Sequence, residues 1–309
     1  MRDIQFIKMQ GAGNDFVLID MLGAINQSPL PDLSSFAREI CDRHFGVGAD
    51  GLILVLPSDK ADYKMRIINS DGSEAEMCGN GIRCFARYIW ENKVGADDSV
   101  GARGRVPVPD SPVAAQNISD IISVETMAGI MIPAFIEENG KFIGVEVDMG
   151  IPRIEALNEE LIVGATIESG PVPDHSNIQN FKINKISMGN PHCVIFVDDL
   201  EGINLSEIGP VIENLPQFQD RTNVEFAKVL NKGEIALKVW ERGAGATLAC
   251  GTGACATVAA AILNDLTDRK VVVHLPGGDL EIEWARDKHL LMRGPAEKVF
   301  EGKLRYNSI

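Results

Sequence analysis

A cysteine followed by a Gly-x-Gly loop occurs twice in the chain, as Cys78-Gly79-Asn80-Gly81 and as Cys250-Gly251-Thr252-Gly253. Each copy precedes apolar residues at helical spacing, which predicts that each cysteine lies at a helix N-terminus. The positive end of the helix dipole favours the thiolate form of such a cysteine. The glycines leave backbone N–H groups open to a carboxylate or phosphate. The repetition indicates two matched thiols that serve one anionic ligand.

The remaining four cysteines, Cys41, Cys84, Cys193 and Cys255, have apolar neighbours and are expected to be inert core thiols. No Cys-x-x-Cys spacing and no His-Glu-x-x-His motif occurs, so we expect no metal site. Six cysteines in 309 residues also do not form the disulfide framework of a small secreted protein.

The composition is that of a globular protein with an acidic balance. Hydrophobic residues make up 45% and charged residues 24%, and the length predicts about two domains. The net charge of −15 argues against nucleic acid and anionic membranes as partners. No apolar run reaches the ~18 residues of a membrane span, and the N-terminus lacks a signal-peptide core. We therefore expect a cytoplasmic protein.

Short apolar runs of β type dominate the chain, and two turn signals, Asn139-Gly140 and Gly277-Gly278, predict hairpins. Antiparallel pairing on this scale favours the α+β class over a parallel doubly wound sheet. The expected strands are 4–9, 16–20, 52–56, 65–68, 121–124, 130–136, 142–147, 194–197, 224–229, 235–240, 271–275 and 280–284.

The two helices that follow the cysteine motifs differ in charge. Residues 254–263 carry no charge, which predicts a helix buried on every side and wrapped by a sheet. The first helix carries Arg83, Arg87 and Glu91 and is expected to be less enclosed. Residues 95–117 lack a hydrophobic period and are typical of a surface loop. The halves are expected to meet near Gly150.

Several other segments are rich in uncharged hydrogen-bonding groups. Asparagine beside glycine or proline is also typical of a plain turn, and His192 alone could be a hydrogen-bonded turn residue. Glu241 and Arg242 follow an apolar strand and precede a glycine-rich loop, where functional groups often lie. Gly251, Gly253 and Ala256 formally fit a dinucleotide fingerprint, but residues 243–249 separate them from the preceding strand, so the match is weak.

In order along the chain, these segments resemble the motifs of the diaminopimelate epimerase family. The resemblance covers nearly the whole chain and is most specific in the two cysteine motifs. The matching segments are Asn14-Asp15-Phe16, His44 to Gly51, Asn69 to Gly81, Met188 to His192, Arg221-Thr222-Asn223 and Trp240 to Gly243, followed by Cys250 to Gly253.

The resemblance implies an enzyme without cofactor or metal that interconverts LL- and meso-2,6-diaminopimelate for lysine and peptidoglycan-precursor synthesis. It implies a homodimer, and an α+β fold of two similar halves with the active site in the cleft between them. Each half would be a mixed, mostly antiparallel sheet curled around a central helix. Residues 1–148 would carry Cys78, with 297–309 returning as a last strand, and residues 149–296 would carry Cys250.

Epimerisation removes a proton from one face of an α-carbon and delivers another to the opposite face, which suits a thiolate and a thiol. Backbone N–H groups at Gly79, Asn80, Gly251 and Thr252 would clamp the reacting carboxylate. The resemblance further implies that His192 and Glu241 support the thiols or bind the α-amino group. The distal amino-acid end would be bound by Asn14, Asn69, Asn190, Asn223 and Arg242. In addition, Gly51 replaces a glutamine that contacts ligand in some relatives, and the stretch 95–117 is longer than typical.

Two other readings remain open. Another two-thiol racemase, such as the proline racemase type, would not need the polar set around Arg242, because its substrate has no distal amino acid. A redox protein could instead cycle Cys78 and Cys250 as a disulfide, although Cys-x-x-Cys spacing is absent. Two measurements separate these interpretations. One compares the activity on diaminopimelate with the activity on proline, and the other follows solvent deuterium exchange into an amino acid.

The two cysteines should act as a unit. We expect Cys78→Ala and Cys250→Ala each to lower epimerisation by at least about 10²-fold, because each removes one acid–base group. The double variant should lose little more than either single one. Steady-state rates measured in both directions check this, and near-normal turnover in either single variant would exclude a two-base mechanism.

Overall fold

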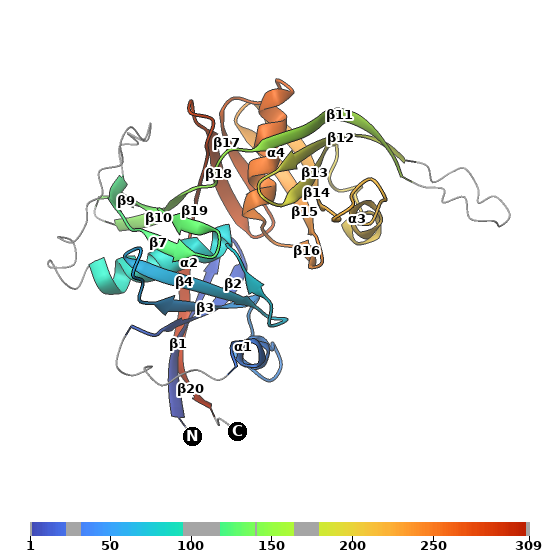
Figure 1. Cartoon of the computed structure of the whole chain (residues 1–309). Coiled ribbons are helices and arrows are strands. Elements are labelled where there is room, and N and C mark those ends of the chain that lie inside the picture. The colour runs from blue at the N-terminus through green and yellow to red at the C-terminus, as the bar shows by residue number, and fades with distance from the viewer. Residues whose placement is uncertain (1, 23–31, 95–117, 140, 164–178, 307–309) are drawn as a thin grey trace, which may run out of the picture. The chain divides into compact units, whose positions relative to one another are not determined.

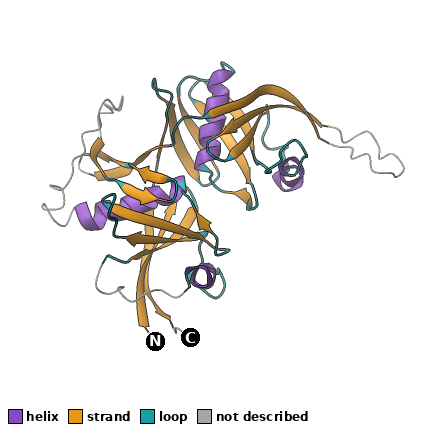
Figure 2. Ribbon diagram, in the orientation of Figure 1, coloured by secondary structure: helices purple, strands orange, loops and turns teal. Residues whose placement is uncertain are grey.

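The computed structural model describes residues 2–22, 32–94, 118–139, 141–163 and 179–306. The chain forms two compact units, Met1–Asp148 with Met292–Ile309, and Met149–Leu291. Strands outnumber helices in both (Figures 1 and 2). The expected α+β class, with mixed, mostly antiparallel sheets, is confirmed. The loop expected at 95–117 lies outside the described residues.

The first unit is built on a sheet in the order β20-β1-β2-β3-β4-β7-β8, with β5 beside β4. The β2–β3 and β4–β7 pairs are parallel. The other strand pairs of this sheet are antiparallel. C-terminal β20 pairs with N-terminal β1 from Arg2↔Tyr306 to Gln10↔Glu297. The bounds are β1 Arg2–Gly11, β2 Asn14–Asp20, β3 Gly51–Leu56, β4 Tyr63–Asn69, β5 Glu74–Ala75, β7 Val124–Thr126, β8 Gly129–Met131 and β20 Glu297–Tyr306.

Helix α2 (Gly79–Ile89) is the central helix of this unit, and a π-helical segment, η2 (Trp90–Val94), continues it. Strands β1 to β4 and β20 pack against it, as do β9 (Ala134–Glu138) and β10 (Lys141–Asp148). The expectation that this helix is less enclosed is wrong, because every α2 residue except Arg87 is buried. Arg83 is 0% exposed, and its guanidinium donates to the carbonyls of Gly79 and Pro295. Hydrogen bonding thus offsets the cost of burying its charge.

The second unit is one sheet in the order β11-β12-β13-β14-β15-β17-β18, with β16 beside β15. Helix α4 (Gly251–Leu263) contacts β12, β13, β14 and β18 of this sheet (Figure 1). Residues 254–261 are all buried, as expected, but the last turn is not, because Leu263 is 38% exposed. The bounds are β11 Arg153–Val163, β12 Gln179–Ser187, β13 Pro191–Phe196, β14 Asn223–Asn231, β15 Glu234–Glu241, β16 Gly245–Thr247, β17 Lys270–Leu275 and β18 Gly278–Trp284.

Both predicted hairpins form, as the antiparallel pairs β9–β10 and β17–β18. The expected strand 130–136 is interrupted between β8 and β9, where Pro133 has no N–H to donate to a ladder. Similarly, β6 (Ile118–Ile121) and β7 replace the expected strand 121–124.

Elements that the sequence pattern did not indicate are α1 (Leu33–Cys41), α3 (Leu205–Glu213), β5, β11, β12, β16 and β19 (Leu290–Gly294). Strand β11 is mostly exposed and interrupted by bulges, so it shows no apolar alternation. Within the described part of the chain, no helix is both long and apolar enough to cross a membrane.

A carboxylate at the start of β2 stabilises the first unit. Asp15 contacts Lys8 Nζ at 2.6 Å and Arg43 Nη2 at 2.8 Å. Burial opposes its ionisation, but hydrogen bonds from Arg43 and Lys8 outweigh this effect and lower its pKa to about 2. The lowered pKa means that Asp15 contributes stability above about pH 4, the pKa of an unfolded aspartate, and that this contribution is lost as pH falls toward 2.

We therefore expect Asp15→Asn to lower the free energy of unfolding by about 2 kcal/mol at pH 7. The difference in the free energy of unfolding between the variant and the unmodified protein should shrink as the pH falls from about 4 to 2. Urea unfolding across pH measures it, with Asp59→Asn in an exposed turn as the matched control. A deficit that stays constant down to pH 2 would contradict the assignment.

Candidate active site

Cys78 is the N-cap residue of α2, as the sequence predicts. Its backbone is extended (φ −138°, ψ 121°), and its sulfur accepts a hydrogen bond from Gly81 N–H at 3.4 Å. A side chain at position 81 would meet Ile67 at 3.0 Å, so glycine lets the helix start close to the sheet. The cysteine is half-buried, and its sulfur faces the N–H groups of the first helical turn.

The predicted residues Asn14 and Asn80 lie beside Cys78. The Cys78 Sγ is 3.7 Å from Asn14 Oδ1, to which Asn80 Nδ2 donates at 3.2 Å. Asn14 Nδ2 donates to Asp50 Oδ2 at 2.7 Å, and Arg83 Nη2 donates to Asn80 Oδ1 at 2.9 Å. A carboxylate only accepts and a guanidinium only donates, so the orientation of both amides is fixed.

Asn69 lies at the end of β4, where its Nδ2 donates to Ser73 Oγ at 3.0 Å. Gly51 pairs with Asn69 in the β3–β4 register. A side chain at position 51 would come within 3.0 Å of the Ile68 carbonyl and would also meet the Phe16 ring. The close approach of β3 and β4 therefore gives a structural reason for glycine at this position.

Cys250 is the N-cap residue of α4, also with an extended backbone (φ −127°, ψ 111°). It is only 5% exposed. Burial raises the pKa of its thiol well above the usual value, and the charges of Glu241 and Glu225 add to this effect, while hydrogen bonds from Thr252 and Gly253 N–H oppose it. At Cys250, loss of hydration therefore opposes the thiolate form that a helix N-terminus is expected to favour.

Four side chains connect Cys250 to the interior of the second unit. Its Sγ lies 3.5 Å from Thr252 Oγ1, which accepts from Asn190 Nδ2 at 3.3 Å. Asn190 Oδ1 lies 3.0 Å from His192 Nε2, and His192 Nδ1 lies 2.6 Å from Glu225 Oε1. The structure thus brings the predicted residues Asn190, His192 and Thr252 together with Cys250.

The neighbouring strand β14 positions Asn223, and β15 positions Glu241 and Arg242. Asn223 Nδ2 donates to the Pro191 carbonyl at 2.8 Å, and its Oδ1 accepts from Arg242 N–H at 3.0 Å. The Asn223 amide thus donates one hydrogen bond and accepts another, and links the strand ends at Pro191 and Arg242. Arg242 Nη1 donates to the Asp220 carbonyl at 2.9 Å. The Glu241 carboxylate makes no hydrogen bond or ion pair to another described residue.

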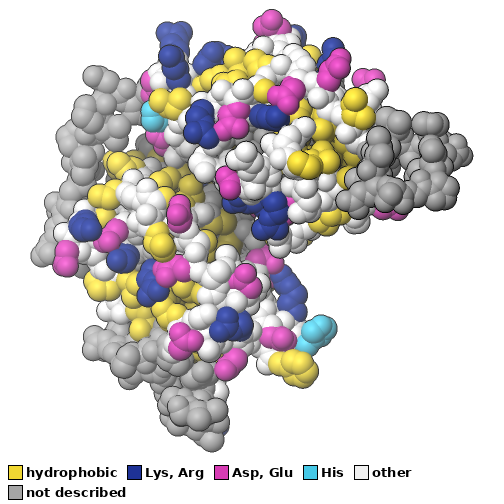
Figure 3. Space-filling model, turned by 45° about the vertical axis from the view of Figure 1, so that its right-hand side comes forward, with side chains coloured by type: hydrophobic (Ala, Val, Ile, Leu, Met, Phe, Trp, Pro, Cys, Tyr) yellow, Lys and Arg dark blue, Asp and Glu magenta, His cyan; other side chains and the backbone are white. Residues whose placement is uncertain are grey.

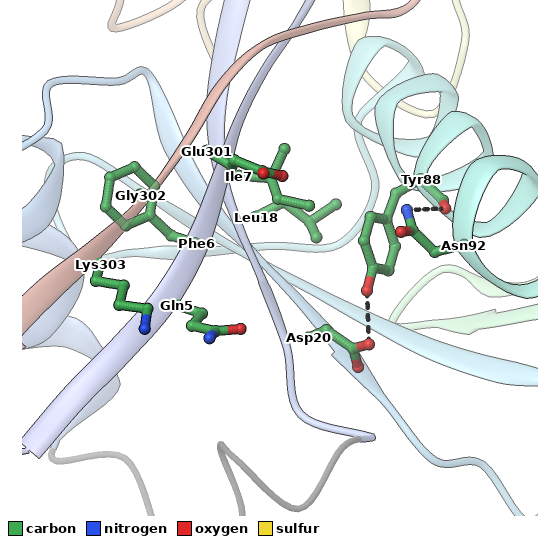
Figure 4. Close-up of a pocket in the computed structure, with 10 residues that line it drawn as sticks. All are labelled: Gln5, Phe6, Ile7, Leu18, Asp20, Tyr88, Asn92, Glu301, Gly302 and Lys303. Atoms are coloured by element: carbon green, nitrogen blue, oxygen red, sulfur yellow. Dashed lines mark hydrogen bonds between the residues drawn. The ribbon is translucent and has the colours of Figure 1, made fainter.

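Two cavities are described, one in each unit. A cavity of about 810 Å³ in the second unit is lined by Arg242, Arg221, Lys185 and residues of the Gly189 turn. A cavity of about 390 Å³ in the first unit lies beside β1, β2, β20 and the α2–η2 helix, where Tyr88 OH donates to Asp20 at 2.6 Å (Figure 4). None of the predicted site residues lines the smaller cavity, so only the larger one adjoins the candidate site.

The side chains available around the site determine which chemistry it can perform. Among the described residues, no group of three or more His, Cys, Asp or Glu is arranged to hold a metal ion. Acidic and basic side chains are interspersed on the face shown in Figure 3. The arrangement offers thiols, amides and helix N-termini, which suit proton transfer and carboxylate binding.

Three charged residues of these networks, Glu225, Arg83 and Asp50, were not predicted. Glu225 is a single acid inside the apolar run Val224-Glu225-Phe226, whereas Arg83 shares a helix face with Arg87 and Glu91 and gave no such signal. A lone charge in a run predicted to be buried is a usable signal, because burial of a charge requires a partner.

Solved structures of other proteins share this fold. A phenazine biosynthesis protein of the PhzF family from Bacillus anthracis superposes with a TM-score of 0.67 at 16% identity, over 99% of this chain and 100% of that one. A hydroxyproline epimerase from Agrobacterium vitis superposes with a TM-score of 0.64 at 13% identity, over 98% of this chain and 91% of that one. These likenesses define the class of two-half, mixed-sheet proteins to which the chain belongs.

The sequence comparison is more specific. The profile of the diaminopimelate epimerase family matches residues 6–105 and 185–299. The diaminopimelate epimerase of Pelotomaculum thermopropionicum is 48% identical over 99% of this chain and 100% of its own length. The chain belongs to the diaminopimelate epimerase family and is an isomerase.

Gly253 tests the local geometry of the second cysteine. A Cβ at this position would lie 2.8 Å from Glu225 Oε1 and 3.3 Å from Cys250 Sγ. We expect Gly253→Ala to lower turnover by about 10- to 100-fold, because groups that orient a functional side chain matter on this scale. Steady-state kinetics check this, with Gly202→Ala as a control because its Cβ would meet only Asp199 Oδ2 at 3.5 Å. Equal rates for both variants would contradict the predicted crowding.

Proposed function

We propose that this protein epimerises LL-2,6-diaminopimelate to the meso isomer without a cofactor. One of Cys78 and Cys250, as thiolate, takes the α-proton, and the other, as thiol, gives a proton to the opposite face. The C–H electron pair is held in the carboxylate and α-carbon until the new C–H bond forms, so the thiol and thiolate exchange roles in each turnover. The observation that carries the proposal is the cysteine N-cap found on the central helix of each unit.

Carboxylate binding follows from the same helix starts. The N–H groups of Gly79 and Asn80 and those of Gly251 and Thr252 belong to the first turns of α2 and α4, at the positive ends of the helix dipoles. We assign these groups to the reacting carboxylate, whose negative charge grows as the proton leaves.

The α-amino group is assigned to Glu241, and His192 supports the Cys250 thiol through Asn190 and Thr252. Glu241 raises the pKa of Cys250 and makes no hydrogen bond or ion pair to another described residue. An α-ammonium group bound to it would neutralise one of the two charges that oppose the Cys250 thiolate. Substrate binding would thus help to bring this thiol into use.

The distal amino-acid end is assigned to Arg242 and to Asn14, Asn69, Asn190 and Asn223. Arg242 uses one guanidinium nitrogen on the Asp220 carbonyl and has further donors for a carboxylate. We further infer a cytoplasmic homodimer that acts in lysine and peptidoglycan-precursor synthesis, with neither nucleic acid nor membrane as partner.

The activity is tested by incubation with LL-diaminopimelate in D₂O, followed by proton NMR of the α-position. We expect loss of the α-proton signal with formation of the meso isomer, and no exchange into proline or hydroxyproline. Exchange into proline alone would favour a proline racemase activity, and no exchange into any amino acid would overturn the proposal.

Arg242 tests the specificity. Lysine keeps the positive charge but lacks the planar fork that binds a carboxylate through two hydrogen bonds. We expect Arg242→Lys to raise KM for LL-diaminopimelate about 10-fold or more, the loss of one charged hydrogen bond. Arg286→Lys, in an exposed turn of the same unit, is the control. An unchanged KM would show that Arg242 does not bind the distal carboxylate.

A further inference from the structure

Glu225 is a fully buried acid for which the mechanism above has no role. It lies on β14 with 0% exposure, and its Oε2 has no hydrogen-bond partner among the described residues. Its Oε1 lies 2.6 Å from His192 Nδ1. A buried carboxylate with a vacant oxygen is costly and calls for an explanation.

With the Asn190 amide oriented as in this structure, its hydrogen bonds define the number of protons on this pair. Asn190 directs its Nδ2 to Thr252 Oγ1, so its carbonyl oxygen Oδ1 faces His192 Nε2. A carbonyl oxygen only accepts, so Nε2 must carry a hydrogen. One further proton lies between Nδ1 and Oε1, on either atom. The pair therefore holds one proton more than a carboxylate beside a neutral imidazole.

This extra proton determines which group donates at each contact between His192 and Cys250. His192 Nε2–H donates to Asn190, and Asn190 donates to Thr252 Oγ1. Thr252 then has its own hydroxyl hydrogen free to donate to Cys250 Sγ, 3.5 Å away. A donor at this distance favours the thiolate over the thiol. Without the extra proton, Nε2 would be an acceptor and the chain would have to reverse.

We propose that Glu225 is a positioning residue that retains a proton with His192 and so directs hydrogen-bond donors through Asn190 and Thr252 to the Cys250 sulfur. This role rests on the proposed function of Cys250 as an acid–base group. The net-neutral pair also removes one carboxylate charge that would otherwise oppose the thiolate.

The surroundings of Glu225 support proton retention. The titratable groups that interact with it are His192 and Cys193 on β13, Glu241 at the end of β15 and Cys250 at the start of α4. Burial raises the pKa of Glu225, and His192 lowers it, while Glu241 raises it. The absence of a side chain at Gly253 allows the carboxylate to approach the start of α4, because a Cβ there would lie 2.8 Å from Oε1.

The first test reads the proton directly and needs no substrate. Nitrogen-15 NMR of labelled histidine, with the His192 signal identified by its loss in His192→Gln, should show a protonated Nε2 between pH 6 and 9. In Glu225→Gln, Nε2 should stay protonated, because the side-chain amide can donate to Nδ1 in place of the shared proton. An unprotonated Nε2 in the unmodified protein would overturn the proposal.

The second test compares turnover in two variants. We expect Glu225→Gln to keep kcat within about 10-fold, because its amide also donates to His192 Nδ1. Glu225→Met keeps the volume without a polar group and should lower kcat by about 10- to 100-fold with little change in KM. A packing role predicts equal rates for the two variants, which would refute the proposal. Glu146→Gln removes a buried carboxylate that pairs with Arg293 in the first unit, and serves as the control.

The two tests separate the inference from the proposed function. If Glu225→Met does not fold, the hydrogen on His192 Nε2 in the unmodified protein decides. If the unmodified protein does not act on diaminopimelate, the proposed function fails, whereas the protonation state of His192 still tests the role of Glu225.

Discussion

Helix α4 has no polar side to turn toward water, so the strands of its unit must cover it, and most other features of the site follow from this burial. Burial removes apolar surface from water and fixes the start of the helix relative to β13, β14 and β15. Cys250, Thr252 and the ends of these strands are thereby held together. The same enclosure of α2 in the first unit fixes Cys78 beside Asn14 and Asn80.

Burying polar and charged groups costs electrostatic free energy, and the two units offset this cost with different side chains. In the first unit, the amides beside Cys78 are oriented by Arg83 and Asp50, neither of which can reverse the direction of its hydrogen bonds near neutral pH. In the second unit, the network begins at Glu225 and His192, which can exchange a proton. The two cysteines therefore occupy similar helix positions but chemically different surroundings, and only the second network can change direction.

The backbone pairing explains how the polar groups of the second unit converge. Parallel pairing of β13 with β14 places His192 opposite Asn223, and antiparallel pairing of β14 with β15 places Val224 opposite Trp240. Glu225 lies two residues after Asn223 and therefore on the same face of β14, directed at α4, while Val224 between them lies on the other face. A shift of one residue in either register would place Val224 on the face that Asn223 and Glu225 occupy.

The sequence by itself determined the α+β class, the helix starts at both cysteines, both hairpins and the family, because turn residues, apolar periodicity and motif order are local signals. It did not indicate α1, α3 or the exposed strand β11, whose apolar patterns are short or interrupted. The tertiary structure alone decided that Arg83 is buried, that Glu225 lies against His192, and that the Cys250 thiol resists ionisation. These properties depend on which strands cover each helix and on the water they exclude, and no local pattern records either.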